Sequence, residues 1–255
     1  MRRIKLTVEY EGTKFHGWQR QPGTRTVQGE IEKALERITN QKVTLHVAGR
    51  TDAGVHANAQ ICHFDVDSKV PLVAFKRGVN RFTSEDVSIL KAEEVTEDFH
   101  ARHSATWRCY TFRILNRAEP SSILRDHAVF VRPILDFDKM TRALSHIVGE
   151  HNFNAFRAAD CESGTPVCNI FEATLTKDGE NITLRIQGDH FLHNMIRITM
   201  GTLVDIGCGK LPESTFKTML KSGNRADGGV TLPPQGLYFT QVGYPEHVVI
   251  EATPD

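Results

Sequence analysis

The chain has 255 residues, enough for two compact cores, and its 40% apolar and 24% charged residues exclude a disordered chain. No run reaches the roughly 20 apolar residues that span a bilayer, and residues 1–8 lack the apolar stretch of a secretory signal, so we expect a cytoplasmic protein. The formal net charge is zero, but residues 1–113 hold 18 Lys/Arg against 14 Asp/Glu, and residues 114–255 hold 13 against 17. This asymmetry permits a basic face for a nucleic acid without indicating one.

Residues 1–104 show the strand and helix patterns of one compact domain. Apolar residues alternate along residues 3–10, as in a strand with one buried face, and Thr26 precedes an apolar stripe of helical spacing at Val27, Ile31, Leu35 and Ile38, as an N-cap does. In order, we expect a strand at 3–10, a helix from Val27, strands at 43–47 and 60–66, a helix opened by Pro71, and a strand at 87–95. This is the order of the ferredoxin-like, or RRM-like, fold.

A similar order recurs in residues 105–255. We expect a strand at 105–115, a helix capped by Asp136 that ends at Gly149, a hairpin of 170–176 and 181–187, helices at about 191–206 and 212–221, and a strand at 237–242. The predicted fold class is therefore α+β. It comprises two ferredoxin-like α/β domains, 1–104 and 105–255, whose antiparallel sheets meet at a central cleft, where ligands often bind.

The loop after the strand at 43–47 contains the clearest candidate for catalysis. It reads Gly49-Arg50-Thr51-Asp52-Ala53-Gly54-Val55-His56-Ala57, and its small residues allow the backbone to approach a ligand closely. Asp52 is expected to be held by rigid elements and still exposed, as a catalytic carboxylate is. The alternative is that Thr51 and Asp52 only cap a turn before Gly54, and residue chemistry by itself favours that alternative.

The cysteines and histidines do not indicate a metal site. Five cysteines occur without a Cys-x-x-Cys pair, so reduced thiols are expected, and a Cys161–Cys168 disulfide is not favoured. Two histidine pairs have i,i+3 spacing, His100/His103 and His190/His193, but no carboxylate or cysteine completes either set. We therefore expect no bound metal.

Five motifs in register along nearly the whole chain, from about residue 3 to residue 244, resemble the TruA-type tRNA pseudouridine synthases. The motifs are Tyr10-Glu11-Gly12-Thr13-Lys14-Phe15-His16-Gly17-Trp18-Gln19-Arg20-Gln21-Pro22 with Thr26-Val27-Gln28-Gly29, the loop at 49–57, Ser104-Ala105 with Arg108 and Tyr110, Phe191-Leu192-His193-Asn194-Met195-Ile196-Arg197 with Gly201-Thr202-Leu203, and Pro233-Pro234-Gln235-Gly236-Leu237-Tyr238.

The resemblance implies that the protein isomerises uridine to pseudouridine in the anticodon stem-loop of tRNA, at positions 38, 39 and 40. By the same resemblance, Asp52 matches the catalytic Asp, Arg50 the active-site Arg two residues before it, Arg197 the basic partner of the Asp, and Tyr110 the active-site Tyr that binds the substrate. It also implies a homodimer without a metal or organic cofactor.

Three positions depart from the family pattern: Leu232 replaces a usual Ala, Phe239 a usual Leu, and Cys109 a frequent basic residue. They touch packing and RNA contact rather than the four site positions, so the expected activity stands.

The reaction itself calls for these residue types. Breaking the N1–C1′ bond and rejoining uracil through C5 needs a carboxylate that attacks the base or the sugar, or stabilises a glycosyl intermediate, and a guanidinium such as that of Arg197 favours its charged form. On the helix expected at 191–206, Arg197 lies one turn after His193, so both are expected to share a face. The target base must leave its stack, so Arg50 is suited to hold a phosphate or fill the gap. Tyr110 is suited to stack on uracil and help remove the C5 proton.

Seven basic residues are further candidates for phosphate contacts, although a solvated charge is the favoured interpretation of any single one: Arg20, Arg25, Lys76, Arg77, Arg81, Arg102 and Arg108. Two other functions stay open, a non-catalytic RNA-binding module and a histidine-based metal hydrolase. The set of Asp52, Tyr110 and Arg197 argues against a pure binder, and activity that is insensitive to chelators would exclude the hydrolase.

Overall fold

The computed structural model describes residues 1–158 and 165–246, and the chain has a mixed α/β fold with extensive β-sheet and several helices. It divides into two compact units, Met1–Trp107 with the residues from Tyr238 onward, and Arg108–Leu237. The expected boundary at residue 104 placed all of 105–255 in the second domain. The structure instead groups the last strand, from Tyr238, with the first unit, where it pairs with a strand of that unit. Among the described residues, none of the helices is long and apolar enough to cross a membrane.

The first unit is built on an antiparallel sheet with β1 (Arg2–Tyr10) at its centre. β1 pairs antiparallel with β3 (His56–Val66) on one side and with β4 (Val87–Val95) on the other. The short β2 (His46–Val47) runs antiparallel to β3. β10 (Leu237–Gly243) joins the other end of β3 in parallel, with Tyr238 beside His56.

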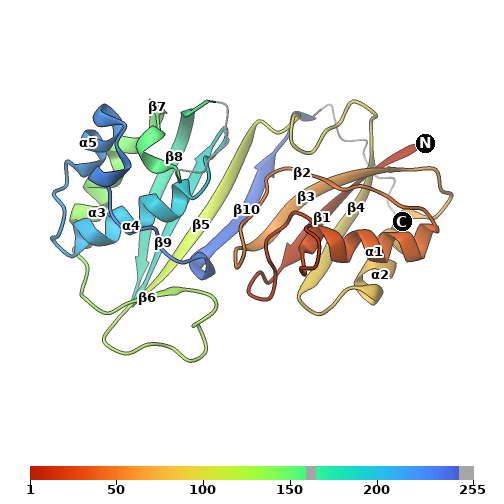
Figure 1. The fold of residues 1–255 in the computed structure, drawn as a ribbon, viewed down its shortest axis with the longest axis horizontal. Coiled ribbons are helices and arrows are strands. Elements are labelled where there is room, and N and C mark those ends of the chain that lie inside the picture. Colours follow the sequence, from red (N-terminus) through yellow and green to blue (C-terminus); the bar gives the residue numbers. More distant parts are fainter. Residues whose placement is uncertain (159–164, 247–255) are drawn as a thin grey trace. The chain divides into compact units, whose positions relative to one another are not determined.

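Two helices cover one face of this sheet, lying next to each other in Figure 1. α1 (Val27–Thr39) begins where the Thr26 side chain accepts a hydrogen bond from the Gly29 N–H, and its buried face includes Val27, Ile31 and Leu35. α2 (Leu72–Phe82) buries Phe75, whose ring meets Phe64 of β3 edge-on with 5.5 Å between centroids. Each such side chain contributes about 1.5–3 kcal/mol through burial.

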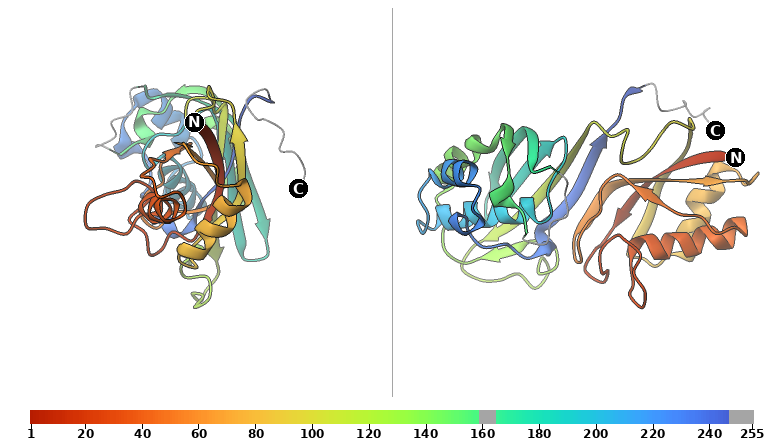
Figure 2. Two further views of the ribbon diagram at one scale, coloured as in Figure 1. Left: turned by 90° about the vertical axis from the view of Figure 1, so that its right-hand side faces the viewer. Right: turned by 45° about the horizontal axis from the view of Figure 1, so that its top comes forward.

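The strands of the second unit run in the order β5 (Trp107–Asn116), β9 (Asn181–Gly188), β8 (Val167–Asp178) and β7 (Gly149–Asn152), with every neighbouring pair antiparallel. β6 (Val129–Val131) pairs in parallel with β5. Its helices pack together in Figures 1 and 2: α3 (Phe137–Leu144), α4 (Met195–Gly207) and α5 (Thr215–Ser222), with 3-10 turns at Ser145–Ile147, Asn154–Phe156, Arg225–Asp227 and Pro234–Gly236.

Most expected elements are confirmed, and some deviate from the expected secondary structure. The strand expected at 43–47 is reduced to β2, and the helix after Asp136 ends as α3 at Leu144, followed by a 3-10 turn. β6 and β7 were not expected. Cys161 lies outside the described residues, so its pairing with Cys168 stays untested.

The helix expected from residue 191 begins at Met195, because Asn194 adopts a left-handed conformation with a φ of 62°, which a right-handed helix cannot include. The prediction that His193 and Arg197 share a helix face is therefore wrong. His193 precedes the helix and is exposed.

Candidate active site

The loop that bears Asp52 connects β2 to β3 in the first unit and is anchored at several points along its backbone. The Ala48 N–H donates to Ile61 O at 2.8 Å, and the Gln60 side-chain amide donates to Gly49 O at 2.8 Å. The Val55 N–H donates to the carbonyl of Asp52 at 3.2 Å, closing a turn. These bonds fix the backbone on both sides of Asp52, whose side chain is half-buried.

Thr51 attaches the loop to the core of the first unit. Its hydroxyl lies 2.7 Å from the Tyr10 hydroxyl, and both residues are buried. Its carbonyl accepts a hydrogen bond from the backbone N–H of Trp18 at 3.0 Å. Burial raises the pKa of Tyr10 to about 12, so the phenol keeps its proton and this hydrogen bond persists over the ordinary pH range. Thr51 therefore turns inward, while Arg50 before it is exposed.

Two glycines of the first motif let another chain segment lie directly against this loop. A Cβ on Gly12 would fall 2.0 Å from Val55 O, and one on Gly17 would fall 2.6 Å from Thr51 O. Gly17 also has a φ of +83°, in the region that favours glycine. The spacing of Gly12 and Gly17 in the sequence is thus a requirement for close contact with the residues flanking Asp52.

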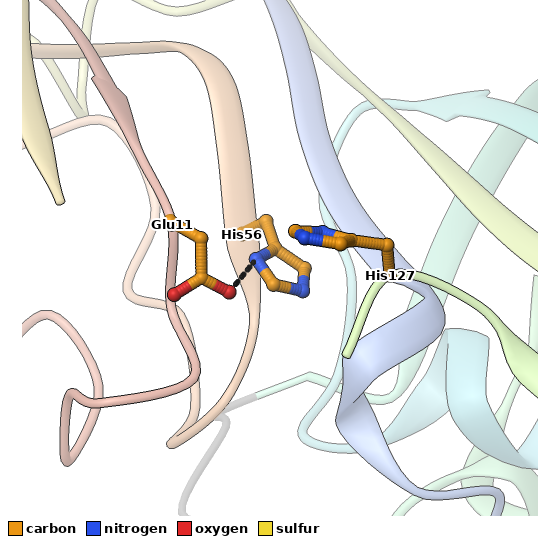
Figure 3. Close-up of side chains that lie close together, drawn as sticks. All are labelled: Glu11, His56 and His127. Atoms are coloured by element: carbon orange, nitrogen blue, oxygen red, sulfur yellow. Dashed lines mark ion pairs between the residues drawn. The ribbon is translucent and has the colours of Figure 1, made fainter. Parts of the chain in front are cut away.

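His56 secures the far end of the loop and was not singled out by the sequence reasoning. Its Nδ1 accepts the Gly12 N–H at 3.0 Å and lies 3.3 Å from the Glu11 carboxylate (Figure 3). Its ring stacks on Tyr238 of β10 with 4.7 Å between centroids. Because the buried Gly12 N–H needs an acceptor, we assign the hydrogen of the ring to Nε2. The signal was present, since His56 belongs to the same motif as Asp52.

Tyr110 lies on β5 of the second unit, opposite Ile186 of β9. Only 9% of its surface is exposed, and its ring meets the Phe191 ring edge-on, with centroids 5.1 Å apart and planes at 78°. Such pairs contribute about 0.5–1.5 kcal/mol beyond burial. The aromatic face is therefore held in one orientation by the strand and by Phe191.

Arg197, in the first turn of α4, is held by two hydrogen bonds within the second unit. Its Nε donates to Leu232 O at 2.7 Å, and its Nη1 donates to the Asn194 side-chain oxygen at 2.6 Å. A guanidinium has five N–H donors in a fixed plane, so two bonds suffice to set its orientation. Leu232 acts here through its carbonyl, so its side chain, which departs from the family pattern, does not enter this contact.

α4 also fixes the segment that carries Leu232. A Cβ on Gly201 would fall 1.8 Å from Val230 O, so this segment crosses the helix at a glycine. The Thr202 hydroxyl accepts the Gly229 N–H at 3.0 Å, and the Asp205 carboxylate accepts the Val230 N–H at 3.3 Å. Both acceptors of the Arg197 side chain are therefore fixed: Asn194 directly precedes α4, and the segment that carries Leu232 is bonded to the helix.

The four site residues are divided between the two compact units. Arg50 and Asp52 share one loop of the first unit, whereas Tyr110 and Arg197 belong to the second. In chemical terms, the first unit supplies a carboxylate on an anchored loop, and the second supplies an oriented aromatic ring and an oriented guanidinium.

Of the histidine pairs considered for a metal, His100 and His103 line a polar pocket together with Arg50. The rings of His100 and His103 are 4.3 Å apart beside β2. His190 contacts Asp189 at 2.9 Å through Nδ1 and the Cys168 sulfur at 3.3 Å through Nε2.

The chain matches the family model described as tRNA pseudouridine synthase over residues 6–104 and 143–245. It is 41% identical to "tRNA pseudouridine synthase A" of Shewanella piezotolerans, over 96% of this chain and 94% of that protein. The protein of the same name from Acetivibrio thermocellus is 40% identical over 96% and 100% of the two chains, and that from Coxiella burnetii 41% over 100% and 97%.

Among solved structures, a chain of an archaeal box H/ACA sRNP Nop10-Cbf5 complex covers 79% of this chain and 43% of its own length, at 11% identity and a TM-score of 0.35. That likeness is too low to support an argument. The sequence matches do support one, because the relatives match 96% or more of this chain and the family model covers the Asp52 loop and Arg197. The chain therefore belongs to the tRNA pseudouridine synthase family.

Proposed function

We propose that this protein isomerises uridine to pseudouridine in the anticodon stem-loop of tRNA, at positions 38, 39 and 40, with Asp52 as the catalytic carboxylate. The single observation that supports this most is the anchoring of the Asp52 loop. Thr51 is buried against Tyr10, and Gly12 and Gly17 make room for the loop backbone. A carboxylate on so rigid a support meets the positional demand of covalent catalysis.

The reaction gives each residue a distinct task in this proposal. The Asp52 carboxylate attacks uracil or C1′, or stabilises the glycosyl intermediate, while uracil turns to present C5 to C1′. The Arg197 guanidinium, oriented by Leu232 and Asn194, stabilises the charged carboxylate. The Tyr110 ring stacks on uracil, and its hydroxyl assists the loss of the C5 proton.

In this proposal Arg50 acts on the RNA strand rather than on the N1–C1′ bond that is broken. A uridine inside or beside a stem must swing out of its stack before the carboxylate can reach it, at a cost of a few kcal/mol. Arg50 is exposed and lies two residues before Asp52, so it enters the space left by the base or holds a neighbouring phosphate. Metal and organic cofactors have no task in this scheme.

The fold proposal follows the same resemblance: each unit is a ferredoxin-like α/β domain, with residues 1–104 forming most of the first and residues 105–237 the second, while β10 joins the strands of the first. Supporting this for the first unit, its strands run in the order β4-β1-β3-β2 with antiparallel pairing throughout, as the strand-helix-strand repeat requires. In the second unit β5, β9 and β8 are likewise antiparallel.

We further propose that the enzyme acts as a homodimer in the cytoplasm. A chain of 28.6 kDa without net charge offers a small basic footprint, and a two-fold dimer lets one subunit grip the tRNA body while the other presents Asp52. Light scattering is expected to give twice the monomer mass. A monomer at concentrations where the enzyme is fully active would contradict this part of the proposal.

The activity is tested by incubating the purified protein with an unmodified tRNA transcript that has uridine at positions 38, 39 and 40, then mapping pseudouridine at single-nucleotide resolution. A matched transcript with cytidine at those positions is the control. Pseudouridine is expected only in the first transcript and only at those positions. Modification elsewhere would overturn the site specificity, and binding without modification would indicate an RNA-binding protein without this activity.

A further inference from the structure

A polar pocket lies within the first unit and includes Arg50 of the catalytic loop in its lining. Its volume is about 230 Å³, and its basic lining residues are His46, Arg50, His100, Arg102 and His103. Within residues 1–158 and 165–246, no aspartate or glutamate lines it. We call it the Arg–His pocket. Two guanidiniums and three imidazoles around a small space form an environment for an anion.

The histidines behind this pocket are packed ring against ring. His46 stacks on the buried His63 with 5.0 Å between centroids, and His100 lies 4.8 Å from His63 and 4.3 Å from His103. Burial, followed by the charges of neighbouring histidines, lowers the pKa of His63 to about 3 and also lowers that of His100. Both rings are therefore neutral near pH 7 and able to accept hydrogen bonds.

These neutral rings shape the turn that carries the outer basic side chains. His63 Nδ1 accepts the Ala101 N–H at 3.1 Å, and His100 Nδ1 accepts the N–H groups of Arg102 and His103 at 3.1 and 3.2 Å. Three successive backbone N–H groups thus bond to imidazoles. The turn is fixed, and it places Arg102 and His103 at the pocket.

A buried carboxylate next to the lining residue Gln28 adds little opposing charge. Glu32, which lies behind Gln28, is engaged by the Arg20 guanidinium, the Gln28 amide and the Leu45 N–H. Its charge is therefore already compensated.

We propose that the Arg–His pocket binds one backbone phosphate of the tRNA beside the target uridine, with Arg102 and His103 on one side and Arg50 on the other. Guanidinium groups match phosphate oxygens with two parallel hydrogen bonds. The volume is below the roughly 300–1,000 Å³ of pockets for drug-sized ligands, and it accommodates a phosphate with part of its ribose. Two guanidiniums, and imidazole nitrogens already used as acceptors, disfavour a metal cation.

This inference rests on the proposed function for its location. Arg50 and Asp52 are two residues apart, so their Cα atoms are at most about 7.6 Å from each other. A phosphate held at Arg50 is therefore a near neighbour of the nucleotide that reaches Asp52. Binding there fixes the strand on one side of the flipped base, and it positions without reading sequence.

The test measures tRNA affinity over a range of salt concentrations for Arg102→Gln and His103→Gln. Each is placed in an Asp52→Asn background, so that binding is read without turnover. Each protonated or cationic phosphate ligand contributes a slope of about 0.9 in log K against log salt. We expect Arg102→Gln to weaken binding at least about tenfold at low salt and to reduce the slope by about one. Arg142→Gln, which removes an exposed charge paired with Glu213 in the second unit, is the matched control with unchanged slope.

Two further arms separate the possible results. Arg102→Lys keeps the charge, so its salt slope is expected to equal that of the Asp52→Asn parent, while part of the tRNA affinity stays lost. The same variant tests the site if Arg102→Gln fails to fold. Inorganic phosphate, compared with chloride at equal ionic strength, is expected to compete with tRNA for the Asp52→Asn protein and not for its Arg102→Gln derivative. A slope in Arg102→Gln equal to that of Arg142→Gln would overturn the proposal. So would phosphate competition without any change in slope.

The outcome is independent of the modification assay. Reduced slopes in a protein that modifies no uridine at positions 38–40 would leave the phosphate site standing and reject the proposed function. Unchanged slopes in a protein that does modify these positions would do the reverse.

Discussion

Replacing His63 by Gln is expected to remove a large part of the acid sensitivity of the fold. His63 is 2% exposed, and burial, with His100, His46 and Arg3 nearby and Asp65 opposing them, lowers its pKa from an ordinary 6.5 to about 3. The folded ring therefore stays neutral where the unfolded chain already binds a proton. Between these two pH values the unfolded state holds more protons, so the free energy of unfolding falls as the pH falls.

The magnitude follows from the same two pKa values. The slope is at most about 1.4 kcal/mol per pH unit, and integration from about pH 7 to about pH 5 gives at most about 2 kcal/mol, reduced where solvent reaches the ring cluster. This is a substantial share of the 5–15 kcal/mol typical of a folded domain. A Gln side chain can still accept the Ala101 N–H that His63 accepts, and it does not titrate.

The measurement is urea unfolding of wild type and His63→Gln at several pH values between these limits. The difference between their stabilities is expected to change by about 1–2 kcal/mol in favour of the variant as the pH falls. His16→Gln, at an exposed position, is the matched control and is expected to follow wild type. Parallel curves for wild type and His63→Gln would refute the reasoning, because they would mean that His63 gains its proton equally in both states.

Two other predictions concern the support and the chemistry of the site. Gly17→Ala is expected to lose at least about 2 kcal/mol of stability, because the new Cβ would lie 2.6 Å from Thr51 O and the residue has a positive φ. Gly23→Ala, with a φ of +73° and no atom within 4 Å of the new Cβ, is expected to lose less. Equal losses in thermal melts of the two variants would contradict the close contact. Tyr110→Phe is expected to bind tRNA as wild type does, since the ring remains, and to slow the single-turnover rate by about 100-fold or more; an unchanged rate would show that the hydroxyl takes no part.

Local patterns in the sequence sufficed for the elements that depend on local chemistry. Thr26 and the stripe from Val27 to Leu35 predicted α1 because a cap and a buried face lie within one stretch of chain. Strand β4 was predicted to the residue. The start of α4 was missed because nothing in the sequence forces the left-handed conformation of Asn194, which asparagine only tolerates better than most residues.

Long-range contacts were beyond the same reasoning. β10 belongs with the first unit because it pairs with β3, some 180 residues earlier in the chain. The Arg–His pocket combines His46 and Arg50 with residues 100–103 from a distant segment, and only the spacing of His100 and His103 was visible beforehand. Asp52 and Arg50 were found through their motif, whereas the reason for Gly12 and Gly17 emerged only from their contacts with the loop.

The central claim is that the Asp52 carboxylate performs the chemistry, and Asp52→Asn tests it most directly. The substitution keeps the size of the side chain and removes its charge and nucleophilicity, so folding and tRNA binding are expected to remain as in wild type. The single-turnover rate of pseudouridine formation on an anticodon stem-loop is expected to fall below detection. A pure variant whose rate stays within about tenfold of wild type, a barrier change of only ~1.4 kcal/mol, would contradict the account.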